Sequence, residues 1–147
     1  MLAKYRHPNI VLMIAAITKP PQLCLVMELV KEGTLFDLLH RKKSNFSEAD
    51  RRRIATQMVS VIAYLHRHGI VHRDIKSHNM LLDKNLTLKL CDFGLARHKV
   101  YHILTETLLN NGPMQFSGTP TYMAPELFEK RSYNESVDVF ALGTLLY

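Results

Sequence analysis

The fold of this 147-residue chain is decided by one stretch, Ile70-Val71-His72-Arg73-Asp74-Ile75-Lys76-Ser77-His78-Asn79. It sets an acid, a lysine and an amide within a few residues of one another, directly behind a segment with helical periodicity. A carboxylate, an ammonium group and an amide at this spacing can converge on one reacting group. Spacing alone favours a simpler interpretation, in which the acid caps a turn.

Two further stretches follow in the sequence. Leu90-Cys91-Asp92-Phe93-Gly94 places a second acid in a turn behind a short apolar run. The other stretch is Gly118-Thr119-Pro120-Thr121-Tyr122-Met123-Ala124-Pro125-Glu126. Three such signatures at strand–turn or helix–turn junctions are improbable as a coincidence, so the interpretation of Asp74 and Asp92 as simple turn caps is disfavoured.

Together the three stretches resemble the catalytic loop, the magnesium-binding loop and the end of the activation loop of protein kinases. The chain resembles a eukaryotic-type protein kinase domain of the serine/threonine type, most like the tyrosine-kinase-like group with its mixed-lineage and Raf-like kinases. Lys76 marks the serine/threonine type. The resemblance implies an α+β, protein kinase-like fold and transfer of the ATP γ-phosphate to Ser or Thr hydroxyls of a protein substrate.

The resemblance assigns four residues to the reaction. Asp74 is expected to orient the attacking hydroxyl or accept its proton, and Lys76 to place a positive charge beside the transferred phosphate. Asn79 and Asp92 are expected to bind Mg²⁺ together with the nucleotide, because amide and carboxylate oxygens suit a hard cation. The implied cofactors are therefore ATP and Mg²⁺.

The run Leu23–Val30 resembles the strand that leads into the kinase hinge, where adenine binds. Met27 matches the gatekeeper, and the backbone of Glu28 and Val30 is expected to face adenine. Leu81 matches the residue that forms the floor of the adenine pocket. Any buried strand shows such an apolar run, so only the surrounding motifs favour nucleotide binding here. Nucleotide contacts are also expected from Lys76, Asn79 and Asp92.

Other positions take supporting roles by the same resemblance. Those expected to stack as an apolar spine are Leu2, Met13, His72 and Phe93. His72 is expected in the interior with no acid–base role. Asp138 matches an acid that accepts backbone hydrogen bonds from the catalytic loop.

Arg73 is expected to pair with a phosphorylated side chain. The candidate acceptors are Thr105, Thr107, Ser117, Thr119 and Thr121, with Ser117 preferred. Thr119 also matches a threonine that forms hydrogen bonds near the catalytic acid and lysine.

Hydrophobic patterning predicts the elements around these motifs. Residues 10–17 and 23–30 are expected to form a largely buried hairpin across Pro20-Pro21. The capping box Ser47-Glu48-Ala49-Asp50 should begin a long helix that ends at Gly69. Its apolar stripe comprises Ile54, Met58, Val61, Ile62 and Leu65. A second hairpin is expected over 80–82 and 87–90, and a further helix over 137–147.

Composition limits the classes of function. The formal charge of +6 is spread along the chain, which favours an ordinary charged surface over a nucleic-acid site. The two cysteines, Cys24 and Cys91, are expected to be free thiols in a reducing, cytoplasmic compartment. Residues 1–8 lack the apolar core of a signal peptide and no apolar run is long enough to span a bilayer, so neither secretion nor membrane insertion is expected.

The expected boundaries are those of a partial protein kinase domain over residues 1–147. Residues 1–27 are a remnant of the small lobe, 28–33 the hinge and 34–147 an incomplete large lobe. The sequence contains no glycine-rich loop and no strand lysine of the kinase type, and the arginine that pairs with the residue matching Glu126 in kinases would fall beyond residue 147. The chain alone is therefore expected to be weak or inactive. The alternative is a catalytically inactive, kinase-like interaction module; the oligomeric state stays open.

Overall fold

The computed structural model describes residues 5–98, 119–129 and 132–147. The chain divides into two compact units, one formed by residues 1–61 and 80–91 and the other by residues 62–79 and 92–147. Helix α1, Glu48–Arg67, contributes to both units. Short strands and helices occur in each unit, as expected for the α+β class.

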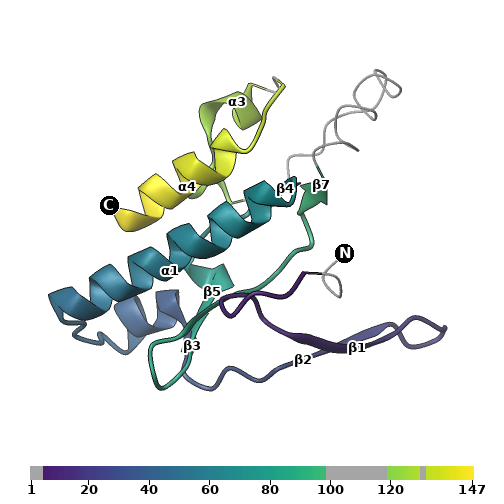
Figure 1. Cartoon of the computed structure of the whole chain (residues 1–147), viewed down its shortest axis with the longest axis horizontal. Coiled ribbons are helices and arrows are strands. Elements are labelled where there is room, and N and C mark those ends of the chain that lie inside the picture. Colours follow the sequence, from purple (N-terminus) through teal and green to yellow (C-terminus); the bar gives the residue numbers. More distant parts are fainter. Residues whose placement is uncertain (1–4, 99–118, 130–131) are drawn as a thin grey trace. The chain divides into compact units, whose positions relative to one another are not determined.

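The first unit contains the predicted hairpin. Strand β1, Met13–Ile17, pairs antiparallel with strand β2, Cys24–Met27 (Figure 1). The prediction that both runs are largely buried is wrong, because every residue of β2 is exposed and only Met13 of β1 is partly covered. A two-stranded ribbon has no second layer of its own, and an apolar pattern cannot show whether another element supplies one.

The start of the first predicted strand takes a different partner. Ile10 and Val11 are buried, and Ile10 forms a parallel bridge with Leu90. The Val11 amide donates to the Leu90 carbonyl at 3.0 Å, and the Leu90 amide donates to the Asn9 carbonyl at 2.9 Å. The run over 10–17 is therefore divided between two partners, and the hairpin strand begins at Met13.

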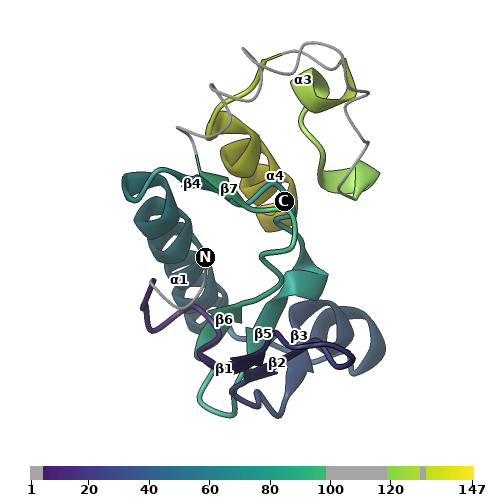
Figure 2. The same cartoon turned by 90° about the vertical axis from the view of Figure 1, so that its right-hand side faces the viewer.

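A three-stranded antiparallel sheet completes the strands of this unit (Figure 2). Its order is β3, Gly33–Thr34, then β5, Met80–Leu82, then β6, Leu88–Leu90. The β5–β6 hairpin was predicted, whereas β3 pairs across a sequence separation that no local pattern reveals. The side chains of Met80, Leu82, Leu88 and Leu90 are fully buried.

Helix α1 begins with the predicted capping box. Ser47 Oγ accepts a hydrogen bond from the Asp50 amide at 3.1 Å, while Asp50 Oδ2 accepts one from the Ser47 amide at 3.2 Å. All five residues of the predicted stripe are buried. At the far end Gly69 has a φ of +69°, a conformation that glycine adopts without strain, and its amide donates to the His66 carbonyl.

Replacing Ser47 by Ala is expected to lower the free energy of unfolding by about 1 kcal/mol, because the Asp50 amide loses its acceptor. Urea denaturation followed by circular dichroism measures this change. Ser44→Ala is the matched control, because this substitution removes a hydroxyl that makes no described hydrogen bond. A midpoint shift as large for Ser44→Ala as for Ser47→Ala would contradict the capping assignment.

The second unit contains short elements around the catalytic-loop stretch. Its strands β4, Ile70–Val71, and β7, Arg97–His98, pair antiparallel. The helical elements are η3, Ser77–Asn79; η4, Pro120–Tyr122; α3, Pro125–Phe128; and α4, Ser136–Leu146. Val71, Ala124 and Val137 form a buried cluster, against which Leu127 and Tyr133 pack. Helix α4 confirms the predicted apolar helix over 137–147.

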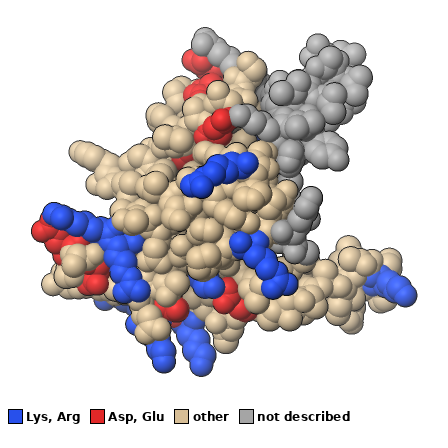
Figure 3. All heavy atoms as spheres, in the orientation of Figure 1, with Lys and Arg blue, Asp and Glu red and all other residues tan. Residues whose placement is uncertain are grey.

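The surface carries charges of both signs. At the beginning of α1, Lys and Arg spheres lie among Asp and Glu spheres (Figure 3), and Arg52 pairs there with Glu48. Neither Cys24 nor Cys91 forms a disulfide bond, as predicted. Among the described helices, none is both long and apolar enough to cross a membrane.

Candidate active site

The catalytic-loop stretch brings three of the predicted site residues together. Asp74 is 7% exposed, and its Oδ2 lies 2.7 Å from Lys76 Nζ and accepts a hydrogen bond from Asn79 Nδ2 at 2.9 Å. The single turn of η3 allows this, since the Asn79 amide donates to the Lys76 carbonyl at 3.0 Å. The carboxylate is therefore held by an ammonium group and an amide from its own loop.

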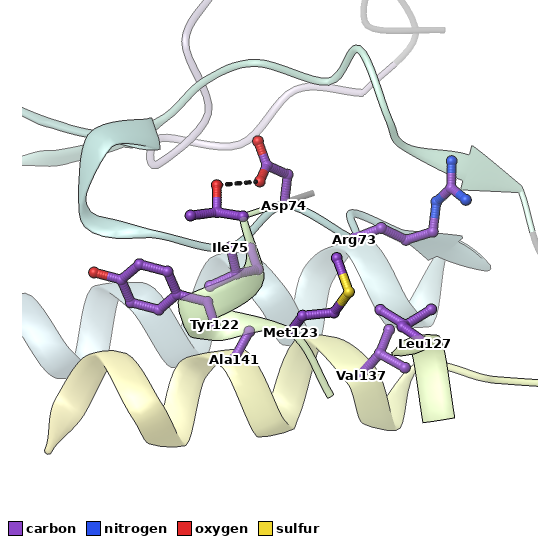
Figure 4. A pocket seen from close by; sticks show the side chains of 9 residues that line it. Arg73, Asp74, Ile75, Tyr122, Met123, Leu127, Val137 and Ala141 are labelled. Atoms are coloured by element: carbon purple, nitrogen blue, oxygen red, sulfur yellow. Dashed lines mark hydrogen bonds between the residues drawn. The ribbon is translucent and has the colours of Figure 1, made fainter. Parts of the chain in front are cut away.

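Thr119 joins this network from the segment that precedes η4. Lys76 Nζ donates to Thr119 Oγ1 at 2.9 Å, and Thr119 Oγ1 donates to Asp74 Oδ1 at 3.3 Å, the bond drawn dashed in Figure 4. The expected position of Thr119 beside the acid and lysine is confirmed. Both carboxylate oxygens of Asp74 now have donors, so its orientation is fixed before any substrate arrives.

A second hydrogen bond links the same two segments. Ser77 Oγ, on η3, lies 3.2 Å from the Tyr122 hydroxyl on η4. Close by, Asp74 borders a small cavity whose apolar wall includes Met123, Leu127 and Val137 (Figure 4). The reactive network thus lies beside an apolar recess of the second unit.

The two predicted metal ligands differ in their surroundings. Asn79 is buried, and its Nδ2 donates both to the Asp74 carbonyl at 2.8 Å and to the Asp74 side chain, so Oδ1 is the atom suited to a cation. Asp92 is exposed, has a φ of +58°, and accepts a hydrogen bond from the Gly94 amide through Oδ1. The described residues include no cluster of three His, Cys, Asp or Glu that could hold a metal.

Asp138 performs the expected positioning role. It is 1% exposed; Oδ2 accepts a hydrogen bond from the His72 amide at 2.8 Å, and Oδ1 accepts one from the Arg73 amide at 2.7 Å. His66 Nε2 lies 2.9 Å from Oδ2. A carboxylate on α4 thereby holds the backbone of the catalytic loop at Arg73, which adopts a φ of +66°.

Arg73 is engaged by two groups in the described structure. Its Nε donates to the Leu95 carbonyl at 2.7 Å, and Nη1 donates to the Tyr133 hydroxyl at 2.8 Å. The guanidinium also lies over the Tyr133 ring, 5.9 Å from its centroid. Of the predicted phosphate acceptors, Thr105, Thr107 and Ser117 lie outside the described residues.

The expected interior position of His72 is confirmed, since the residue is fully buried. Its ring packs edge-on against Phe93 at a centroid distance of 4.9 Å, as expected for two members of the spine. Met13 belongs to the other unit, and Leu2 lies outside the described residues. Glu126 is half-buried and accepts a hydrogen bond from Ser136 Oγ at 3.4 Å.

The residues predicted to contact adenine lie in the first unit. Met27 ends β2 and is 45% exposed, and Leu81 is a half-buried residue of β5. The Glu28 amide donates to the Leu12 carbonyl at 2.9 Å. Within the described part of the chain, no hydrogen bond engages the Glu28 carbonyl or the Val30 amide. These two backbone groups could form hydrogen bonds with a flat heterocycle.

The Glu28 side chain is held as firmly as its backbone. Its Oε1 accepts hydrogen bonds from the Leu12 amide and from Lys89 Nζ, both at 2.8 Å. Partial burial alone would raise the pKa of this carboxyl, but the bonds from Lys89 and Leu12, with the Lys89 charge, hold the pKa below its ordinary value. The carboxylate is therefore ionised at neutral pH.

Sequence reasoning missed several partners that the structure supplies. Tyr133 and Leu95 at Arg73, His66 at Asp138, and Lys89 at Glu28 all come from distant positions. For Lys89 a weak signal existed, because it interrupts an apolar strand. No local pattern marks Tyr133, Leu95 or His66.

Comparison with known proteins agrees with this geometry. The protein kinase domain family matches residues 1–147. The serine/threonine-protein kinases CTR1 and STY46 of Arabidopsis thaliana are 40% and 38% identical to the chain, and serine/threonine-protein kinase DCLK1 of Rattus norvegicus is 41% identical. Each match covers 100% of this chain but only 18%, 24% and 32% of the relative's own length, so the chain spans less than a third of these curated relatives.

The names of these relatives agree with the serine/threonine type expected from Lys76. The fold expectation is confirmed as well, since the family match runs through both compact units. On its motifs, its site geometry and this match, the chain belongs to the protein kinase domain family.

Proposed function

We propose that the protein carrying this chain is an ATP-dependent serine/threonine protein kinase. The observation that carries the proposal is the partly buried network in which Lys76 Nζ lies 2.7 Å from Asp74 Oδ2 and 2.9 Å from Thr119 Oγ1. A carboxylate, an ammonium group and a threonine in contact suit the alignment of a substrate hydroxyl against a phosphoryl group. The names of the relatives support the same activity.

In the proposed reaction the substrate hydroxyl oxygen forms a bond to the γ-phosphorus of ATP, and the bond to the bridging oxygen breaks to release ADP. Asp74 orients the hydroxyl and accepts its proton. Lys76 stabilises the negative charge on the transferred phosphate oxygens. The Thr119 hydroxyl orients both side chains through its hydrogen bonds with them.

Asn79 and Asp92 fit a magnesium ion, because amide and carboxylate oxygens are the ligands that this hard cation prefers. With these two residues as protein ligands, phosphate oxygens of the nucleotide and water molecules would supply the remaining ligands. When bound, Mg²⁺ supplies neutralisation of phosphate charge.

We propose that adenine binds at the Glu28 carbonyl and the Val30 amide, beside Met27 and above Leu81. The division into small-lobe remnant, hinge and large lobe at residues 1–27, 28–33 and 34–147 belongs to the same proposal. The proposed partners are ATP and a protein substrate, with no nucleic acid and no membrane insertion. A cytoplasmic location is supported by the two free cysteines.

Transfer of radiolabelled γ-phosphate to a generic basic protein tests the proposal. Acid hydrolysis of the labelled product should yield phosphoserine and phosphothreonine. Chelation of Mg²⁺ by EDTA should abolish the incorporation, and added MgCl₂ should restore it. Label found only on tyrosine would refute the serine/threonine assignment, and labelling that survives EDTA would refute the metal assignment.

A second candidate is an inactive, kinase-like module that binds partners. The observation in its favour is the exposed apolar surface of the β1–β2 hairpin, where Ile14, Leu23 and Leu25 are 62%, 77% and 56% exposed. Such a module would bind a partner without any metal-dependent incorporation of label. The same assay therefore separates the two functions.

A further inference from the structure

Glu28, directly after β2, is held by three hydrogen bonds. Its amide donates to the Leu12 carbonyl at 2.9 Å, and its Oε1 accepts from the Leu12 amide at 2.8 Å. Oε1 also accepts from Lys89 Nζ at 2.8 Å. With backbone and side chain both fixed, the direction of the unengaged Glu28 carbonyl is fixed too.

Lys89 connects this anchor to the neighbouring sheet. On β6, Lys89 stands directly opposite Leu81 on β5. Directly opposite residues of antiparallel strands present their side chains on the same face, with their Cβ atoms about 5 Å apart. The stem of Lys89 therefore runs beside the Leu81 side chain, and its ammonium group ends at Glu28.

The Lys89–Glu28 ion pair is partly shielded from solvent. The side chains of Lys89 and Glu28 are only 18% and 28% exposed, so solvent screens their attraction less than that of a surface pair. By comparison, the Arg52–Glu48 pair has both side chains more than three-quarters exposed. Burial raises the pKa of Asp83, but backbone hydrogen bonds from Thr87 and Asn85, and to the smallest extent the Lys89 charge, bring it below its ordinary value. The carboxylate that pairs directly with Lys89 is therefore Glu28.

We propose that the Lys89–Glu28 ion pair is a positioning device for nucleotide binding, which sets the Glu28 carbonyl at a defined height over Leu81. The inference rests on the proposed adenine site and adds two residues outside the catalytic loop to it. Lys89 acts through Glu28 and is a positioning residue. Loss of the pair should weaken nucleotide binding without changing the chemistry at Asp74.

A double-mutant cycle tests the coupling between the two side chains. Glu28→Gln removes the negative charge but keeps an acceptor for the Leu12 amide, and Lys89→Met removes the ammonium group but keeps an apolar stem beside Leu81. The dissociation constant of a fluorescent ATP analogue with Mg²⁺ should rise about five- to tenfold in each single variant. The double variant should bind no worse than either, because the pair acts as one unit.

Three further measurements make the result specific. Lys89→Arg should restore most of the affinity, and Lys84→Met, which removes an exposed lysine from the β5–β6 turn, should leave it unchanged. The KM for ATP should rise with kcat unaltered in the single variants. Thermal unfolding of each variant identifies any that is misfolded; the Lys89→Arg and Glu28→Gln results then carry the test.

The outcomes separate the inference from the function beneath it. If the wild type binds the nucleotide and both single variants bind it with the same affinity, the positioning role is overturned and the kinase assignment stays intact. Additive losses in the double variant also overturn it. No nucleotide binding by the wild type overturns the proposed adenine site and this inference with it.

Discussion

Replacing Asp74 by Asn is expected to lower the rate of phosphotransfer roughly 10²- to 10⁴-fold, the range of a lost general base. The fold should survive. An asparagine oxygen at the Oδ2 position can still accept from Lys76 and Asn79, and its amide nitrogen can donate to Thr119. What disappears is the negative charge that orients the hydroxyl and takes its proton.

Initial rates of radiolabel incorporation measure this effect. Glu48→Gln is the control, because Glu48 is a carboxylate of an exposed pair on α1. Circular dichroism and nucleotide affinity should match the wild type in both variants. A rate within fivefold of the wild type for Asp74→Asn would remove Asp74 from the reaction and with it the main support for the proposed mechanism.

Replacing Asp138 by Ala is expected to destabilise the protein by about 3–5 kcal/mol, the usual effect of removing one partner from a buried charged group. The amides of His72 and Arg73 would lose their acceptors inside the protein, and His66 would lose its carboxylate. The positive φ of Arg73 would also lose its support. Because total stability is only about 5–15 kcal/mol, this loss is a large fraction of it.

Thermal and urea unfolding measure the change, with Glu48→Ala as a surface control expected to alter stability by less than about 1 kcal/mol. Asp138→Asn should fall between the control and Asp138→Ala, because the amide keeps one acceptor oxygen but turns the other into a donor. Equal stability of Asp138→Ala and Glu48→Ala would show that the buried carboxylate does not hold the catalytic loop.

The sequence was most informative where the signal is local. The capping box at Ser47, the stop at Gly69 and the stripe of α1 were all predictable, since helical contacts join residues three or four positions apart. The motif around Asp74 likewise predicted the contacts with Lys76 and Asn79, because a single helical turn closes them.

The sequence misled where burial depends on a neighbouring layer. The apolar runs over 10–17 and 23–30 predicted a buried hairpin, yet β1 and β2 are mostly exposed. An apolar pattern indicates that burying these side chains would lower the free energy of the fold. It does not indicate whether another element is present to bury them.

By itself the sequence indicated the family, the residues of the catalytic loop that lie together and the extents of the main helices, because these depend on residue identity and short-range spacing. Only the tertiary structure decided which other distant groups complete the site: His66 at Asp138, Tyr133 at Arg73 and Lys89 at Glu28. Such pairs are set by the packing of whole elements against one another, so local spacing does not identify a partner sixty or more residues away along the chain.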